Sequence, residues 1–181
     1  MAVDRQSGRR HKNNMRTAFD FEPERVHPDA RVFLEGIRKH DWMATHIYAG
    51  DTTPSFTYTT GLCLTKGIPE LIAFALDMGR AHAALRIIIN EADHGDRLPV
   101  GRPISGLFDT VDVFLFATDQ TKHAEYLLRS AWFYDDAPFA CEQLVIPDQA
   151  GRFPWEDDCD PLFRSVQPDL TERGWAASLA R

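Results

Sequence analysis

Nine polar and aromatic side chains lie next to the most apolar stretches of the chain and could form a binding site. They are Tyr58, Thr59, Glu70, Trp132, Tyr134, Gln143, Asp148, Arg152 and Trp155. Ligand sites combine aromatic walls with a few polar groups, so one interpretation is a pocket on which these residues converge. The other interpretation is structural, because polar groups beside buried strands need partners. In that case Glu70 and Arg152 form a charge-assisted pair that fixes the closing segment to the core.

Familiar signatures of metal binding and catalysis are absent from the sequence. The seven histidines form no HExxH or H-x-H pattern, and the three cysteines form no CxxC. A zinc site needs three or four convergent ligands, so His94 and Asp96 indicate a helix end, and no metal is predicted. No G-x-S-x-G, G-x-G-x-x-G or Walker A sequence occurs, which leaves any reaction and any cofactor unknown. Cysteine packs as a small hydrophobe, so Cys63 and Cys141 are expected to be buried and inert, with a Cys–His pair as the alternative.

The composition predicts a single acidic domain. The chain has 181 residues, of which 44% are hydrophobic, with a net charge of −7 and a pI near 5.4. An acidic chain is a poor match for nucleic acid or an anionic membrane, because such binding neutralises negative charge. No apolar run approaches the roughly 20 residues of a membrane helix, and no secretory signal is visible. Three widely spaced cysteines suit a reducing compartment, so a cytoplasmic location is expected.

The two ends of the chain differ in charge. Residues 1–16 contain five arginine or lysine residues, one aspartate and almost no apolar side chains. We therefore predict a disordered basic tail over residues 1–20. This tail is a solvated segment, or the product of an upstream start codon with Met15 as the true start, or a nucleic-acid-binding arm. Residues 156–181 begin with four acidic side chains in five positions and are predicted to form an acidic C-terminal extension.

The strongest structural signal is the stretch from Phe56 to Leu76, which reads FTYTTGLCLTKGIPELIAFAL. Its first part alternates aromatic and β-branched residues, which predicts a strand. Gly61 can adopt backbone angles that other residues avoid, so a bend is expected there. The apolar run from Leu71 to Leu76 is too short for a normal helix and predicts a strand covered on both faces. Its large apolar side chains should be nearly inaccessible to solvent.

The flanking segments complete an α+β pattern. Helices are predicted over residues 26–40 and 78–92 and after residue 119, and further strands over 42–49, 111–117 and 139–146. Asp77 and Asp119 are the expected helix caps, and residues 98–106, rich in glycine and proline, are expected to form a loop. This order is not a regular βαβ series. We therefore predict one domain over residues 26–155, a mainly antiparallel sheet packed by two or three helices, with Trp155 over the strand that contains Gln143.

Five motifs, FTYTTGL, PEL, AWFY, QLVIPD and GRFPW, occur in this order between residues 56 and 155. Together they resemble a bacterial family, the domain-of-unknown-function family 4262, over roughly residues 37–155. The chain departs from the family pattern at three positions, where Ile68 replaces a histidine, Ala75 a glycine and Ile146 a tryptophan. If that histidine is catalytic in other members, this chain lacks the chemistry. The resemblance implies an architecture but no reaction, because no activity is established for the family.

Two classes of function follow. The missing catalytic signatures and the many aromatic residues favour a non-catalytic binding or regulatory module whose partner is a protein or a small molecule. An acidic surface would suit a basic partner. The alternative is a small-molecule-binding enzyme or sensor that uses the same pocket. For that alternative, residues 58–76 are similar in outline to part of the flavin-reductase-like split barrel, which is an analogy of fold only.

Overall fold

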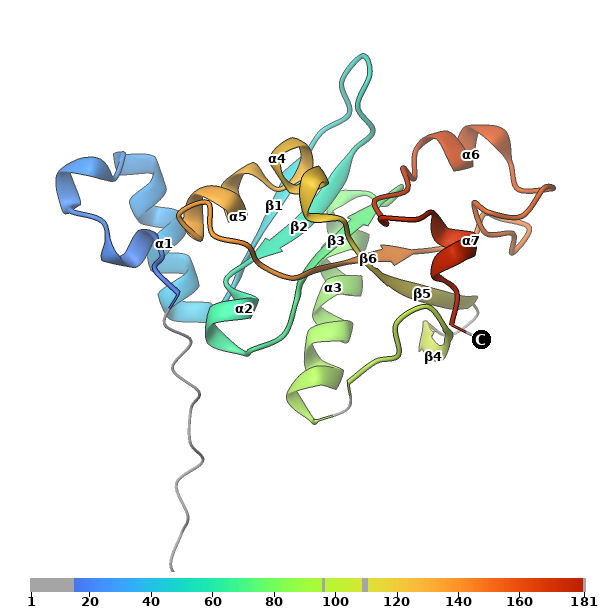
Figure 1. The fold of residues 1–181 in the computed structure, drawn as a ribbon, viewed down its shortest axis with the longest axis horizontal. Helices are drawn as coiled ribbons and strands as arrows, with labels where there is room; N and C mark the ends of the chain where they lie inside the picture. The colour runs from blue at the N-terminus through green and yellow to red at the C-terminus, as the bar shows by residue number, and fades with distance from the viewer. Residues whose placement is uncertain (1–14, 96, 109–110, 181) are drawn as a thin grey trace, which may run out of the picture.

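A six-stranded sheet forms the centre of the protein (Figure 1). The computed structural model describes residues 15–95, 97–108 and 111–180. The strands are β1 (Met43–Ile47), β2 (Phe56–Thr60), β3 (Glu70–Phe74), β4 (Pro103–Phe108), β5 (Val111–Ala117) and β6 (Cys141–Val145). Their order across the sheet is β1-β2-β3-β6-β5-β4. All neighbouring strands are antiparallel except β3 and β6, which are parallel, so the sheet is mixed but mainly antiparallel.

Several helices pack on this sheet, which confirms the predicted α+β single domain. The two longest are α1 (Pro28–His40) and α3 (Met78–Asp93). The shorter ones are η1 (Ala18–Asp20), η2 (Pro23–Arg25), α2 (Leu62–Thr65), η3 (Gln120–Lys122), α4 (His123–Tyr126), α5 (Leu128–Phe133), α6 (Pro161–Ser165) and α7 (Trp175–Ser178). None of the described helices is long and apolar enough to cross a membrane.

The middle of the sheet is buried on both faces. Every residue of β2 and β3 is buried. On one face, α3 brings Leu85 and Ile89 into a cluster with Leu71 and Leu115. On the other face, Phe74 belongs to a cluster that side chains from α1 and α5 complete. A strand covered on both faces reads as a continuous apolar run, which is why the sequence predicts β3 correctly.

The strand β3 ends earlier than predicted. It stops at Phe74, because Ala75 adopts a left-handed conformation with φ 59°. That region is unfavourable for a residue with a Cβ and favourable for glycine, which the resemblance places at this position in other members. Leu76 lies beyond the strand and is only half-buried, so the prediction that it is inaccessible is wrong.

Local sequence determines where several helices begin and end. Pro28 occupies the first turn of α1, where its missing N–H costs no hydrogen bond. Asp77 caps α3 by accepting a hydrogen bond at 2.9 Å from a backbone N–H three residues on, as predicted. Asp119 caps η3 by accepting a hydrogen bond at 2.9 Å from the backbone N–H two residues on. The helix predicted after Asp119 is divided into η3, α4 and α5, because Leu127 leaves helical angles at φ −118°, ψ 37°.

One strand lies where the sequence predicts a loop. β4 begins within residues 98–106 and pairs with β5 from Pro103 onwards. β4 is an edge strand of the sheet, and edge strands tolerate proline because not every N–H needs a partner. Its register shifts between Ile104 and Phe108, around Gly106 with φ 77°. The shift interrupts the alternation of apolar and polar residues by which a strand is recognised.

The N-terminal boundary of the domain differs from the predicted one. Residues 1–14 of the predicted disordered tail lie outside the described residues. Residues 15–20 pack on the domain, with Thr17 capping η1 and Ala18 buried. The ring of Phe19 lies edge-on to that of Phe133, with 5.2 Å between the ring centroids. A few apolar side chains therefore extend the folded part to before residue 20.

The acidic C-terminal extension folds back onto the sheet. The side-chain oxygen of Gln143 accepts a hydrogen bond from the Leu170 N–H at 3.1 Å, and its amide group donates to the Pro168 carbonyl at 2.8 Å. Leu170 and Trp175 are both buried. The extension is therefore part of the domain's packing, although its composition is polar.

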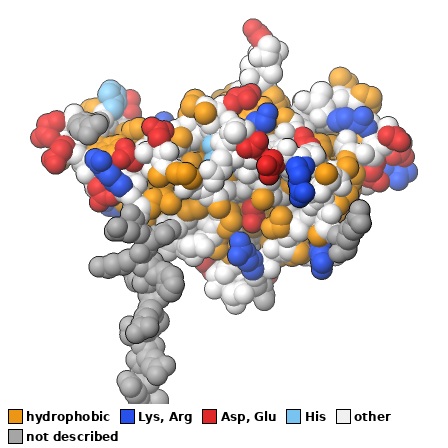
Figure 2. All heavy atoms as spheres, viewed as in Figure 1, with side chains coloured by type: hydrophobic (Ala, Val, Ile, Leu, Met, Phe, Trp, Pro, Cys, Tyr) orange, Lys and Arg blue, Asp and Glu red, His pale blue; other side chains and the backbone are white. Residues whose placement is uncertain are grey.

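Side chains of both charges lie on the face seen in Figure 2, with hydrophobic side chains between them.

We expect Phe74→Ala to lower the free energy of unfolding by about 3–5 kcal/mol, the usual range for a fully buried phenylalanine. Leu76→Ala is the control two residues away and should cost less, because Leu76 is half-buried. Urea denaturation of both variants measures the difference. A loss below about 1 kcal/mol for Phe74→Ala would place this strand outside the core.

Candidate functional site

The structure distributes the nine predicted site residues over three places. Thr59, Glu70 and Tyr134 form a buried cluster. Tyr58 and Trp132 line an open groove. The remaining four lie in the C-terminal segment or against it: Gln143, Asp148, Arg152 and Trp155. The nine residues therefore do not line one common pocket.

The carboxyl group of Glu70 is the centre of the buried cluster. Glu70 is fully buried. Its Oε2 accepts a hydrogen bond from the Thr59 hydroxyl at 2.6 Å, and its Oε1 accepts from the N–H groups of Gly61 at 2.9 Å and Cys63 at 3.2 Å. The Tyr134 hydroxyl also donates to Oε1. Four neutral donors therefore satisfy this carboxyl group.

The predicted ion pair between Glu70 and Arg152 is not formed. Arg152 Nε lies 3.0 Å from Asp158 Oδ2, and both side chains are about half exposed. Ion pairs of this exposure contribute little to stability. The prediction assumed that a buried carboxyl group needs a cation, whereas hydrogen bonds from neutral groups can also stabilise it.

Gly61 makes the Glu70 cluster possible. It adopts φ 116° at the start of α2, which confirms the predicted bend. A Cβ atom at this position would lie 2.8 Å from the Asp41 carbonyl oxygen and 3.0 Å from Ile37 Cγ2. Neither the backbone angle nor the space accepts a side chain. Glycine therefore lets the first N–H groups of α2 reach the carboxyl group.

Burial dominates the protonation of the groups in this cluster. Burial raises the pKa of Glu70, and the donated hydrogen bonds, first of all that from Thr59, partly offset the effect. Burial and the nearby Glu70 raise the pKa of Cys63 to about 11 and raise that of Tyr134 even further. Cys63 is half-buried and stays a thiol at neutral pH, which makes it a poor nucleophile, while Cys141 is buried as expected. The cluster has the properties of a structural contact.

Asp148 organises the turn that follows β6. Its Oδ1 accepts hydrogen bonds from the N–H groups of Ala150 at 2.9 Å and Arg152 at 2.8 Å, and its Oδ2 accepts from the N–H of Asp160 at 2.9 Å. These bonds, above all that from Asp160, lower the pKa of Asp148. All three donors are backbone groups, so the carboxylate holds the chain in place.

Trp155 packs against the sheet through aromatic contacts. Its ring centroid lies 5.0 Å from that of Phe114 and 5.5 Å from that of Phe116, both in β5. It shares a cluster with Val145 of β6, the strand that contains Gln143. This placement agrees with the predicted closing role of Trp155.

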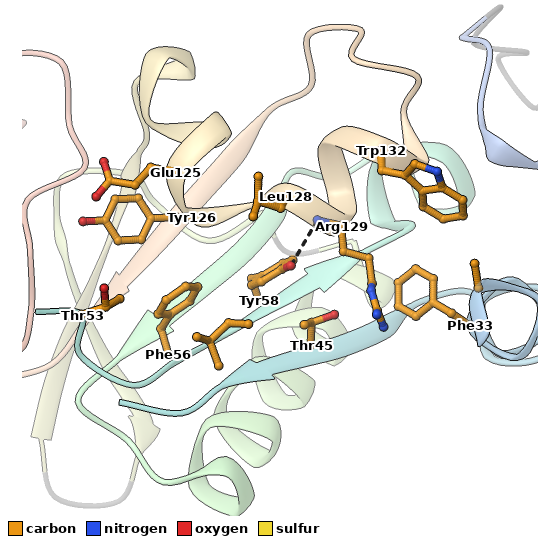
Figure 3. A pocket seen from close by; sticks show the side chains of 12 residues that line it. Phe33, Thr45, Thr53, Phe56, Tyr58, Glu125, Tyr126, Leu128, Arg129 and Trp132 are labelled. Atoms are coloured by element: carbon orange, nitrogen blue, oxygen red, sulfur yellow. Dashed lines mark hydrogen bonds between the residues drawn. The ribbon is translucent and has the colours of Figure 1, made fainter. Parts of the chain in front are cut away.

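A groove of about 480 Å³ lies beside β1 and β2 and is bordered by side chains from α1, α4 and α5 (Figure 3). We call it the β1–α5 groove. Its lining residues are Ala30, Phe33, Thr45, Ile47, Thr53, Phe56, Tyr58, Glu125, Tyr126, Leu128, Arg129 and Trp132. Most of this wall is aliphatic or aromatic. Both the volume and the lining are typical of small-molecule sites.

One end of the groove carries three groups that can donate hydrogen bonds, from Tyr58, Thr45 and Arg129. The Tyr58 hydroxyl oxygen accepts a hydrogen bond from the Arg129 backbone N–H at 3.3 Å, and burial raises the pKa of this phenol, which is neutral at pH 7. Thr45 Oγ1 is buried. Its hydroxyl lies close to the Tyr58 phenol and lowers the pKa of that phenol. It nevertheless forms no hydrogen bond of normal geometry with the described residues. The Arg129 side chain reaches this end, 4.8 Å above the centre of the Phe33 ring (Figure 3).

The other end of the groove is acidic. Glu125 and Tyr126 lie there side by side, near Thr53 (Figure 3). Burial and the neighbouring Glu125 raise the pKa of Tyr126. Glu125 itself is exposed. The groove therefore has a basic end at Arg129 and an acidic end at Glu125, with apolar walls between them.

Hydrogen bonds hold α5, which forms one wall of the groove, to the sheet. Ser130, next to Arg129 on α5, is fully buried. Its hydroxyl lies 3.0 Å from the Thr59 carbonyl oxygen, to which it donates, and 2.7 Å from the Thr60 hydroxyl. The hydrogen bonds of Ser130 therefore fix the position of α5 over β2.

The sequence identified only two residues of this groove, Tyr58 and Trp132. It missed Thr45, which lies opposite Tyr58 in the β1–β2 register, and Arg129, which precedes Trp132 by three residues in α5. Both signals were available, because residues three apart on a helix share a face and paired strand residues are neighbours.

No group of three or more histidine, cysteine, aspartate or glutamate side chains within the described part of the chain could hold a metal ion. Asp96 lies outside the described residues.

A family model described as a domain of unknown function, DUF4262, matches residues 36–160, which is more than half of the chain. Comparison with the curated proteins and with the solved structures found no match.

The buried carboxyl group generates a prediction about pH. Burial raises the folded-state pKa of Glu70 above its ordinary value of 4.5, so the folded protein holds the proton more tightly than the unfolded chain. This contribution to stability is complete below pH 4.5 and is lost as the pH rises through the folded-state pKa. The unfolding free energy of the wild type minus that of Glu70→Gln should therefore fall as the pH rises above 4.5.

Chemical denaturation at several pH values measures this difference. Glu35→Gln, which removes an exposed carboxyl group from α1, is the matched control. A difference that rises with pH would mean that the four hydrogen-bond donors outweigh the burial of Glu70.

Proposed function

This chain belongs to the DUF4262 family, and from that premise we propose that it is a cytoplasmic, non-catalytic binding module whose β1–α5 groove takes a small amphipathic molecule. The description of the family names no activity, so the proposal depends on the geometry of the groove. An aromatic hollow with a few polar groups at its ends is the usual form of a small-molecule site.

The observation that carries the proposal is the hydroxyl group of Thr45. A buried hydroxyl without a hydrogen bond costs free energy, and most buried polar groups have a partner. Thr45 Oγ1 has none among the described residues, and Thr45 is one of the residues that line the groove. The oxygen is covered in the free protein, so a ligand would reach it, and remove this cost, when the side chains over it move aside.

The lining of the groove favours binding over catalysis. None of its twelve residues is a histidine, cysteine or serine. The phenol of Tyr58 is neutral at pH 7, since burial raises its pKa further above the ordinary value of 10.0, so it is a donor rather than a base. The sheet is open, with β1 and β4 at its two edges, so it does not support the analogy with the flavin-reductase-like barrel.

We expect Thr45→Val to raise the free energy of unfolding by about 1 kcal/mol, because it removes a buried hydroxyl that has no partner. Thr59→Val is the matched control. It should lower stability by about 1–3 kcal/mol, because the Thr59 hydroxyl donates to Glu70 and accepts from the Leu71 N–H at 2.9 Å. Urea denaturation without ligand compares the two. A loss of stability in Thr45→Val would show that its hydroxyl is already satisfied in the free protein.

The binding role is tested with the neutral aromatic dye N-phenyl-1-naphthylamine, whose fluorescence increases in apolar surroundings. The protein should bind this dye, and Leu128→Gln should weaken binding by about fivefold, because it removes an apolar wall of the groove. Leu162→Gln is the control, since Leu162 is similarly exposed (78% against 66%) but lies outside the groove, on α6. Equal weakening in both variants would contradict a site in the groove.

A further inference from the structure

We propose that the ligand of the β1–α5 groove is a small monocarboxylate with one aromatic ring, whose carboxylate lies at the Arg129 end. This inference rests on the proposed binding function and names the chemical class that the groove would take.

The charge and the hydrogen atoms at the Arg129 end select an anion. The guanidinium group is positively charged, and the phenol of Tyr58 is neutral and can donate. The Tyr58 oxygen already accepts from the Arg129 backbone, which leaves its own proton to be shared. Thr45 adds a hydroxyl without a hydrogen bond to the described residues. Both hydroxyls are covered in the free protein, since Tyr58 is 2% exposed and Thr45 Oγ1 is buried, so a carboxylate meets the exposed Arg129 side chain first and reaches them when neighbouring side chains move. Donors of this kind are complementary to a carboxylate.

Arg129 is prepared for a planar anion. Its guanidinium carbon lies over the Phe33 ring at 4.8 Å, so one of its faces is occupied. A guanidinium group stacked in this way presents its edge, where two parallel N–H groups match a carboxylate. Arg129 forms no ion pair with any carboxylate of the described residues, and its side chain is exposed. An incoming anion therefore does not have to displace an internal partner.

The walls between the two ends suit a flat apolar body. Phe56 and Tyr58 form one side of the groove, and Leu128 lies across from them (Figure 3). Leu128 is 66% exposed in the free protein, so a ring that covers it removes apolar surface from water. This interaction supplies affinity, and the charged end supplies orientation.

The acidic end limits the ligand to one negative charge. Glu125 lies at the end of the groove opposite Arg129 (Figure 3). A second carboxylate there would face Glu125 and the neighbouring Tyr126, and like charges at close range oppose binding. The groove should therefore discriminate against dicarboxylates of the same length.

The test compares three probes that share one carbon skeleton: 3-phenylpropanoate, the neutral 3-phenylpropanamide and the cationic 3-phenylpropylamine. Each is titrated into the full-length protein, and amide chemical shifts in β1, β2 and α5 are followed by NMR. The carboxylate should shift signals around Thr45, Tyr58 and Arg129. It should bind at least about tenfold more tightly than the amide, since a hydrogen bond to a charged group is stronger than one between neutral groups.

Arg129→Gln should weaken binding of 3-phenylpropanoate by about tenfold and remove its advantage over the amide. The backbone N–H that Tyr58 accepts from is retained in this variant. Arg86→Gln, an exposed arginine on α3 across the sheet, is the matched control and should bind like the wild type. Arg129→Lys keeps the charge without the planar edge, so its affinity for 3-phenylpropanoate should lie between those of the wild type and Arg129→Gln. This variant preserves the test if Arg129→Gln is less stable.

The outcomes separate this inference from the proposed function. Equal binding of the carboxylate and the amide, or preference for the amine, would overturn the carboxylate assignment and leave the groove as a binding site. Failure of all three probes to shift groove signals would also overturn it, while the response of the neutral dye to Leu128→Gln decides separately whether the groove binds ligands.

Discussion

A buried carboxyl group without a cationic partner connects three parts of this fold. Glu70 opens β3 and receives hydrogen bonds from Thr59 at the end of β2, from the turn at Gly61 and from Tyr134 at the end of α5. These partners lie 9 to 64 residues away in the sequence. Through Tyr134 the carboxyl group fixes the end of the helix that carries Arg129 and Trp132. The wall of the groove that α5 forms therefore depends on a contact that lies outside the groove.

The parts of the fold that the sequence predicts are those with a local cause. β3 is recognisable because burial on both faces requires a continuous apolar run, and the start of α3 is recognisable because Asp77 caps its own helix. β4 was missed because an edge strand can contain Pro103 and a bulge at Gly106. The divided helix after Asp119 was missed because nothing in the residue types near Leu127 indicates a break.

The candidate site was harder to predict, because it depends on contacts between distant segments. The need of Glu70 for partners was foreseeable, but their identity was not, since Tyr134 lies 64 residues away. The nine residues identified from the sequence mix three environments, and only Tyr58 and Trp132 belong to the groove. Thr45 could be placed beside Tyr58 from the pairing of the two strands, but its residue type does not mark it as a site residue. Its missing hydrogen bond becomes visible only when the whole surrounding structure is known.

The position of β6 has a consequence for how the chain reaches its folded state. β6 is the last strand in the sequence, yet it lies in the middle of the sheet, between β3 and β5. During synthesis β3, a strand that is buried throughout in the folded protein, is complete long before Cys141–Val145 is made, so one of its edges stays unpaired. Parallel pairing over such a sequence separation is slow, and an open apolar edge can pair with other chains. The risk of aggregation in this protein is therefore concentrated in the interval before residue 145 leaves the ribosome.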